Sequence, residues 1–222
     1  MNVILALLAP SARARGKKGK RMNEVKVIKE GYAHSIGPAQ EYADGTITLI
    51  KGEKNLIVDT GLPQDRGLIL SALKKEGLRP RDIDYVVCTH GHSDHIGNNN
   101  LFPSATFIVS YDVSKKDLYT FHDFRAASYR ICSDIEVIST PGHTSEDISV
   151  VVRNTSYGTV VIVGDLFECE KDLEDENLWR RFTKGSAEQQ EVNRRKVLNI
   201  ASYIVPGHGR MFRVPKAYTV PQ

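Results

Sequence analysis

The sequence predicts a mixed α/β fold in which sheet layers are covered by helices. Short apolar stretches typical of strands follow one another along the chain, and two longer segments carry apolar residues at helical spacing. Runs of strands interrupted by helices are typical of such layers. The 222 residues, 41% of them hydrophobic and 26% charged, can bury one sizeable core. No linker-like tract divides the body of the chain, so we expect one domain.

The expected strands are short, and several end next to Gly, Asp or His. They cover residues 25–28, 46–51, 55–59, 83–88, 105–110, 135–139, 148–152, 159–163 and 203–205. Gly52-Glu53 between the second and third of these strands indicates a hairpin.

Two helices are expected, over residues 64–76 and 187–200. In the first, Leu68, Ile69, Ala72 and Leu73 recur at helical spacing, and Gly77 suits the position just after the helix. In the second, we expect Val192, Val197, Leu198 and Ile200 to contact the core.

A basic leader over residues 1–22 precedes the domain, which we place at residues 23–222. Six basic side chains and no acidic one fall within residues 1–21, and the rest of the chain has 24 basic and 27 acidic side chains. The body therefore presents no broad nucleic-acid-binding face. We expect the leader to be disordered or to act as a targeting signal, with a nuclear address and a mitochondrial transit peptide both open. Its apolar run, residues 3–9, is too short to span a membrane.

The three cysteines, Cys88, Cys132 and Cys169, form no C-x-x-C pair. This odd count argues against a disulfide framework and against a cysteine-based zinc site. It fits a protein of a reducing compartment.

A cluster of histidines marks the chemistry of the chain, in the run Thr89-His90-Gly91-His92-Ser93-Asp94-His95. In an extended segment His90 and His92 point to the same side and can bind one ion. Asp94 and His95 follow where the chain turns into an expected helix start, so they should point towards a second ion. Imidazole and carboxylate together suit zinc, iron or manganese.

Three further candidate ligands lie just after expected strands, each in a turn that contains Gly. They are His143, Asp165 and His208. Glycine lets the backbone bend so that such a side chain projects from the sheet edge. Either histidine alone would be an exposed loop residue, but together with the run from His90 to His95 they predict a shared metal site.

These motifs, in this order, resemble those of the metallo-β-lactamase superfamily. The resemblance runs from about residue 24 to residue 214 and implies a four-layer αββα sandwich with the site along one sheet edge. It implies two divalent ions, zinc first, with iron or manganese open. His90, His92 and His143 would bind the first ion, Asp94, His95 and His208 the second, and Asp165 would bridge them. Asp59 matches an early Asp that orients ligands in the superfamily, or else it stabilises a turn.

A narrower resemblance extends the motifs through Leu101-Phe102-Pro103, Gly164-Asp165-Leu166-Phe167-Glu168 and Val205-Pro206-Gly207-His208-Gly209. These stretches are similar to the family of metallo-β-lactamase domain-containing protein 1. That family implies a zinc-dependent endoribonuclease for the 3′-end processing of replication-dependent histone pre-mRNA, in nucleus and cytosol. The expected partner is then single-stranded RNA or another small anionic substrate, with no membrane partner and with a homodimer left open. The resemblance does not explain the basic leader.

The expected mechanism is hydrolysis by water held between two ions about 3.5–4 Å apart. The positive charge of two divalent ions exceeds the negative charge of two carboxylates and one hydroxide, so the site should favour anionic substrates. Asp94 or His122 would carry the proton that the leaving group needs. Near His122, residues Tyr111, Lys115, Lys116, Tyr129 and Arg130 form either a stacking wall for single-stranded RNA or a surface excursion packed on the sheet.

Two other enzyme classes remain open at this point. One is a thioester or ester hydrolase of the glyoxalase II kind, although residues 211–222 are too few for the helical domain that usually follows there. The other is a single-iron enzyme of the persulfide dioxygenase kind, against which the retention of Asp94, His95 and His208 argues. A serine hydrolase has no support, because no G-x-S-x-G motif occurs.

Overall fold

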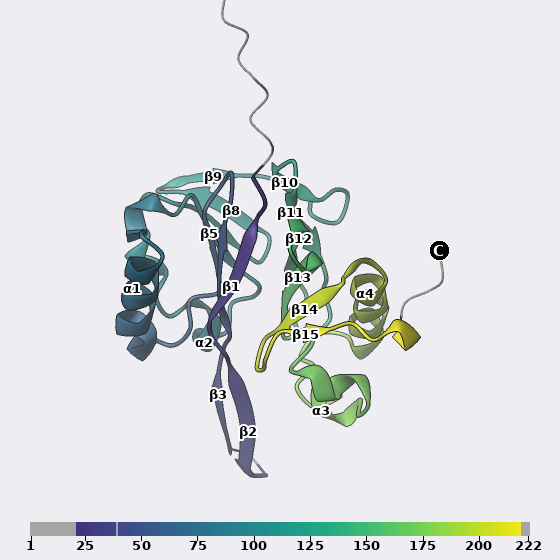
Figure 1. Cartoon of the computed structure of the whole chain (residues 1–222). Coiled ribbons are helices and arrows are strands. Elements are labelled where there is room, and N and C mark those ends of the chain that lie inside the picture. The colour runs from purple at the N-terminus through teal and green to yellow at the C-terminus, as the bar shows by residue number, and fades with distance from the viewer. Residues whose placement is uncertain (1–20, 39, 219–222) are drawn as a thin grey trace, which may run out of the picture.

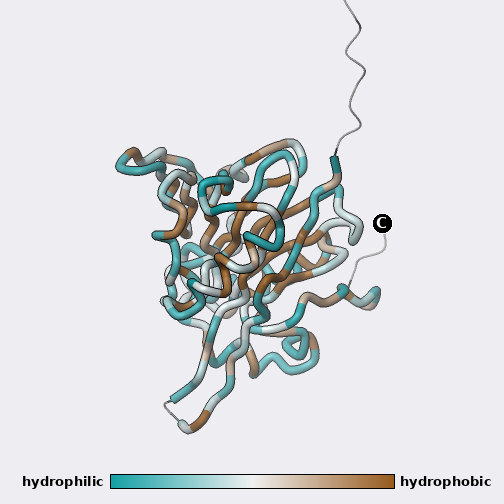
Figure 2. Tube along the Cα trace, turned by 60° about the vertical axis from the view of Figure 1, so that its left-hand side comes forward, coloured by the Kyte–Doolittle hydropathy of each residue, from teal (hydrophilic) through white to brown (hydrophobic). Residues whose placement is uncertain are grey.

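Two β-sheets packed face to face form the centre of the molecule (Figure 1). The computed structural model describes residues 21–38 and 40–218, so residues 1–20 of the basic leader lie outside the described part. Figure 2 shows hydrophobic stretches gathered in the central strands and mostly hydrophilic connections around them.

The first sheet has seven strands in the order β1-β4-β5-β6-β7-β8-β9. Their bounds are β1 Glu24–Lys29, β4 Ile47–Lys51, β5 Leu56–Val58, β6 Tyr85–Cys88, β7 Thr106–Val109, β8 Asp112–Lys115 and β9 Leu118–Thr120. The β5–β6 and β6–β7 pairs are parallel and the other pairs are antiparallel. The expected strands at 25–28, 46–51, 55–59, 83–88 and 105–110 all fall in this sheet.

The second sheet has six strands in the order β10-β11-β12-β13-β14-β15. Their bounds are β10 Tyr129–Cys132, β11 Ile135–Ser139, β12 Ile148–Thr155, β13 Gly158–Gly164, β14 Tyr203–Pro206 and β15 Phe212–Arg213. Only β13 and β14 are parallel neighbours among the described strands of this sheet. The connection between them is long enough to contain α3 (Asn177–Arg180) and α4 (Ala187–Ile200).

Helices cover both outer faces, which confirms the expected four-layer αββα sandwich (Figure 1). Helix α1 (Arg66–Lys75) packs on the first sheet, and α3 and α4 lie on the side of the second sheet. The short α2 (Ser93–Ile96) lies at one edge, and 3₁₀ turns cover Pro63–Asp65, Pro80–Asp82, Asn99–Leu101, Glu170–Leu173 and Lys216–Tyr218. Within the described residues, no helix is both long and apolar enough to cross a membrane.

Alternation along the strands explains why their sequences are apolar almost throughout. Val87 and Val150 belong to the core between the two sheets, whereas Val86 packs towards α1 and Val151 towards α4. Strands buried on both faces need no polar side. Short continuous apolar runs in the sequence therefore mark the centre of this sandwich.

The two expected helices form, but their buried faces differ from the expectation in part. Gly77 follows α1 with φ +72°, as expected of a glycine after a helix end. In α4, Val197 and Leu198 are buried as expected, but Val192 is 65% exposed and Ile200 41% exposed, so these two assignments were wrong. The buried face of α4 instead includes Gln190 and Arg194, which bind backbone groups near Asp165.

An arm of two strands was not expected from the sequence. Strands β2 (Tyr32–Gly37) and β3 (Gln40–Asp44) pair only with each other and project from one end of the sandwich (Figure 1). His34 lies on this arm and packs against the rings of Tyr32 and Tyr42. The base of the arm is adjacent to the cluster of histidines described next, because Ala43 lines the same cavity as these histidines.

Candidate metal centre

Every candidate ligand lies at one edge of the sandwich, just beyond a strand. His90 and His92 follow β6, and Asp94 and His95 lie in the first turn of α2. From the second sheet come His143 between β11 and β12, Asp165 after β13, and His208 after β14. The structure brings all seven side chains together, although they are spread over 119 positions of the chain.

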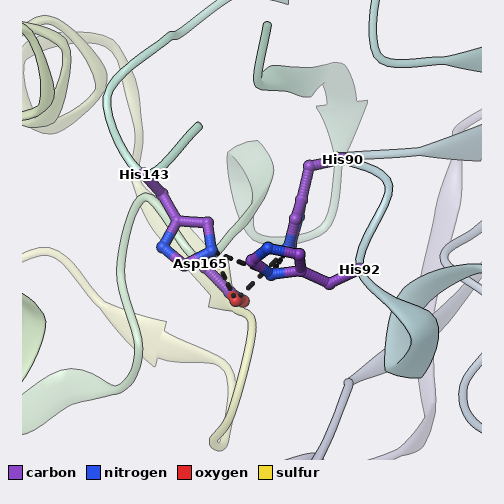
Figure 3. Close-up of side chains that lie close together, drawn as sticks. All are labelled: His90, His92, His143 and Asp165. Atoms are coloured by element: carbon purple, nitrogen blue, oxygen red, sulfur yellow. Dashed lines mark hydrogen bonds and ion pairs between the residues drawn. The ribbon is translucent and has the colours of Figure 1, made fainter. Parts of the chain in front are cut away.

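The first donor cluster consists of His90, His92, His143 and one oxygen of Asp165 (Figure 3). His92 Nδ1 lies 2.9 Å from His90 Nε2 and 3.1 Å from His143 Nε2. Asp165 Oδ2 lies 3.5 Å from His90 Nε2 and 3.4 Å from His143 Nε2. Ligands about 2.0–2.1 Å from a tetrahedral zinc ion are roughly 3.3 Å apart. The four donors therefore have the spacing of a ligand shell.

The second donor cluster consists of Asp94, His95 and His208, together with the other oxygen of Asp165. Asp165 Oδ1 lies 3.3 Å from both His95 Nε2 and His208 Nε2. Asp94 Oδ2 lies 3.7 Å and 3.8 Å from the same two nitrogens. The two oxygens of Asp165 thus face different clusters.

Unpartnered donor atoms show that these residues fit metal ions. His95 Nε2 and Asp165 Oδ1 are buried, and neither atom has a hydrogen-bond partner. Polar atoms buried in this way are costly unless a ligand satisfies them. Metal ions would be such ligands, because they bind neutral imidazole and ionised carboxylate.

The electrostatics of the first cluster also suit metal binding. Burial and the neighbouring imidazoles hold the pKa of His90 well below its usual value, and burial lowers the pKa of His143 to about 4. Both rings are therefore neutral and present a free lone pair. Although burial opposes ionisation of Asp165, His208, His95 and His90 hold its pKa well below the usual value.

Asp59 orients the second cluster from behind. Its carboxylate accepts from Thr89 N at 2.7 Å, from Thr89 Oγ1 and from His95 Nδ1 at 2.9 Å. With Nδ1–H donated to Asp59, His95 presents Nε2 to the cluster. Asp59 is 2% exposed and adopts φ +55°. These contacts match the ligand-orienting alternative for Asp59 rather than a turn-stabilising one.

Two supporting acids were not singled out from the sequence. Asp147 accepts from Gly142 N and from Thr144 N and Oγ1, which ties down the turn that carries His143. Burial raises the pKa of Asp147 to about 7. In the sequence, its position four residues after His143 in a Gly-containing turn could have indicated that Asp147 supports this turn. Glu168, the second acid, is buried three residues after Asp165.

His122 is not brought to the metal centre. Its Nε2 lies 3.0 Å from Ala127 O, and its ring packs against Phe124 and Tyr129. Its contacts in the described structure include none with the seven ligands. The expectation that His122 carries the leaving-group proton is therefore corrected: packing holds the ring within its own loop.

The aromatic side chains near His122 pack on one another. Tyr111 stacks on Phe124, and its hydroxyl lies 2.6 Å from Ser139 Oγ. Tyr129 packs against the same Phe124 ring. This arrangement favours the packed surface excursion over a free stacking wall.

A cavity of about 140 Å³ opens over the ligands. Besides ligands it is lined by Glu41 and Ala43 of the arm, by Phe182 and Lys184, and by Glu168. Glu41, Phe182 and Lys184 also line a neighbouring groove of about 430 Å³ with Arg181. The metal centre therefore adjoins a longer groove between the arm and the segment that follows α3.

Comparison with known proteins agrees with this geometry. The model of the metallo-beta-lactamase superfamily matches residues 43–208. The chain belongs to the metallo-β-lactamase superfamily. It is a metal-dependent hydrolase of that superfamily.

Relatives of the superfamily resemble most of the chain. It is 45% identical over 197 residues to metallo-beta-lactamase domain-containing protein 1 of Xenopus laevis, covering 87% of this chain and 83% of that protein. A metallo-beta-lactamase-like protein of Thermotoga maritima matches with a TM-score of 0.67 at 21% identity, covering 87% of this chain and all of that one. An N-acyl homoserine lactone hydrolase with its product at the catalytic metal centre matches with a TM-score of 0.63 at 20% identity, covering 85% and 93%. The two solved structures support the fold.

Proposed function

We propose that this chain is a two-metal hydrolase that cleaves phosphodiester bonds of single-stranded RNA. Two ions are proposed because the oxygens of Asp165 face two donor clusters. Bound there, divalent ions would supply Lewis acidity and lower the pKa of a water molecule. The single observation that favours RNA is the groove of about 430 Å³ that continues from the metal-site cavity.

The groove suits a chain-like anionic substrate. Arg181 and Lys184 supply exposed cations along it, and Lys184 is held beside the ligands because its backbone N–H donates to His143 O at 2.8 Å. Phosphate groups of a bound strand would pair with these cations. The Arg181 guanidinium lies over one face of the Phe182 ring, 4.4 Å from its centroid, so a base would stack on the other face. The substrate could then extend over the groove while one linkage reaches the ligands.

Asp94 is the chain's own candidate for proton transfer. Its side chain lines the cavity and is 14% exposed, more than the 0–5% of His90, His95, His143, Asp165 and His208. We propose that the Asp94 carboxylate, through the oxygen that does not face the second cluster, receives the proton of the attacking water and passes it to the leaving oxygen.

A comparison of substrates tests the RNA proposal. The purified protein, loaded with defined amounts of zinc, manganese or iron, is given single-stranded RNA, a thioester, a lactone and a persulfide side by side. We expect RNA cleavage that is lost in His92→Ala. Robust thioester or lactone turnover without RNA cleavage would overturn the proposal, and equal cleavage by His92→Ala would identify a contaminant.

The groove has its own test. Replacing Arg181 and Lys184 with Ala should weaken RNA binding and reduce its salt dependence, because each lost phosphate contact lowers the salt slope by about 0.7 for a single strand. The matched control is Lys115→Ala, an exposed lysine of β8. If the control weakens binding and the groove variant does not, RNA binds on the β8 side instead.

The number of ions is tested with Asp165→Ala. This variant should lose both ions or hold one loosely, because one side chain serves both clusters. Asp112→Ala, an exposed carboxylate on β8, is the matched control. Two tightly bound ions per chain in Asp165→Ala, measured by elemental analysis, would contradict the bridging role.

Ester hydrolysis is the second candidate function. The cavity directly over the ligands is only about 140 Å³, which suits a compact substrate, and the lactone hydrolase shares this fold. Polarisation of a carbonyl oxygen would need the same donor clusters. The lactone and thioester arms of the substrate comparison decide between this candidate and RNA.

A further inference from the structure

Glu168 is a third carboxylate at the metal centre, and its backbone is fixed there on both sides. Its N–H donates to Asp172 Oδ2 at 2.6 Å, and its C=O accepts from His208 N at 2.8 Å. The preceding residue, Phe167, accepts from Gly207 N in the same way. The segment carrying Glu168 therefore runs beside the one carrying His208.

The Glu168 side chain turns towards the ligands. It is 6% exposed, and its Oε2 lies 3.8 Å from His208 Nε2. Its Oε1 is buried without any hydrogen-bond partner. The donor atoms of Asp165, Glu168 and His208 all lie within 4.8 Å of one another, and all three residues line the cavity.

The Glu168 carboxyl group forms an ion pair with His208 at 3.8 Å, and no lysine or arginine among the described residues forms a salt bridge with it. The acidic groups Asp165 and Asp172 lie near it instead. A carboxylate buried among other carboxylates is costly, and a divalent cation between them would remove that cost.

We propose that Glu168 is a metal ligand of the second cluster, alongside Asp94, His95, His208 and Asp165. This inference rests on the two-metal centre proposed above. The first cluster then offers three imidazoles and one carboxylate, whereas the second offers two imidazoles and three carboxylates. Oxygen-rich sites favour manganese and magnesium more than nitrogen-rich sites do. The second site is accordingly the one that takes a hard divalent cation such as Mn²⁺.

The proposal is tested by Mn²⁺ binding to metal-free protein. Wild type, Glu168→Gln and Glu168→Ala are titrated with MnCl₂ while free Mn²⁺ is followed by electron paramagnetic resonance. We expect two ions in wild type, and an affinity for the second ion that is about 10- to 100-fold weaker in both variants. Glu170→Gln is the matched control, because Glu170 is exposed two residues further along the same segment.

Folding is measured in the same samples. Without metal, Glu168→Gln should melt at the same temperature as wild type or higher, because Gln keeps the shape of the side chain and removes a carboxyl group whose ionisation is disfavoured by burial and by the nearby Asp165 and Asp172. A purely structural Glu168 would instead lower the melting temperature without changing metal affinity, and that result overturns the inference.

The two proposals fail in different ways. Two ions of unchanged affinity in Glu168→Gln overturn the role of Glu168 and leave the two-metal centre standing. A single ion in wild type overturns the two-metal centre itself, and the second-site role of Glu168 with it.

Discussion

Gly207 precedes His208, and replacing it with alanine should displace the carboxylate that serves both donor clusters. A Cβ atom at Gly207 would lie 1.9 Å from Asp165 Oδ1 and 2.9 Å from Gly164 C. A carbon–oxygen contact needs roughly 3.3 Å, so the oxygen or the backbone must move by about 1.4 Å. Metal sites tolerate ligand displacements of only about 0.2 Å. The Gly207→Ala variant should therefore lose a tightly bound ion.

The size of the effect follows from that displacement. A misplacement of about 1 Å at a reacting centre lowers the rate on the order of 100-fold, so we expect at least that loss of hydrolytic activity. Overpacking should also lower the free energy of unfolding by about 1–3 kcal/mol.

The assay is metal content after dialysis, together with turnover and a denaturant melt. Gly91→Ala is the matched control, because a Cβ there meets no atom within 4 Å although the residue lies between His90 and His92. If Gly207→Ala keeps two ions at wild-type affinity, the added methyl group does not displace the Asp165 carboxylate, and the predicted steric conflict is refuted.

Three further predictions concern the ligands and their supports. Asp59→Asn should weaken the ion at the second cluster about 10- to 100-fold, because the charged acceptor for His95 Nδ1–H is lost; unchanged affinity in a metal titration would contradict this. Asp147→Ala should lower the free energy of unfolding by about 1–3 kcal/mol, since buried N–H groups beside His143 lose their acceptor, and an unchanged denaturant midpoint would speak against it. On acidification the second ion should leave first. Burial alone would lower the pKa values of His95 and His208, but Asp165 raises both above the usual 6.5. Protons therefore begin to compete with the metal for the Nε2 atoms of these two residues above pH 6.5. His143 in the first cluster, by contrast, stays neutral down to about pH 4. Metal content after dialysis over a pH series measures this order, and simultaneous loss of both ions would disprove it.

Much of the fold was predictable because its central strands are buried on both faces. Their sequences are short apolar runs bounded by turns, so the strands that carry the ligands were located to within a few residues. The β2–β3 arm was not predictable in this way. Its two strands pair only with each other and leave Tyr32, Ile36 and Tyr42 exposed, so no burial pattern marks them. The buried face of helix α4 was also not predictable from apolar spacing. Its polar residues Gln190 and Arg194 face inwards because they donate hydrogen bonds to the backbone carbonyl of Leu166.

What the sequence by itself determined is the chemistry of the metal centre. Metal binding is the main use for closely spaced imidazole and carboxylate groups such as those from His90 to His95, when further donors follow other strands. Only the tertiary structure decided which groups join them. It brought Glu168 into the cavity, kept His122 out, and set each oxygen of Asp165 towards a different cluster. The physical reason is that ligand identity is a local property of residues, whereas donor separations depend on how two sheets from distant parts of the chain meet at one edge.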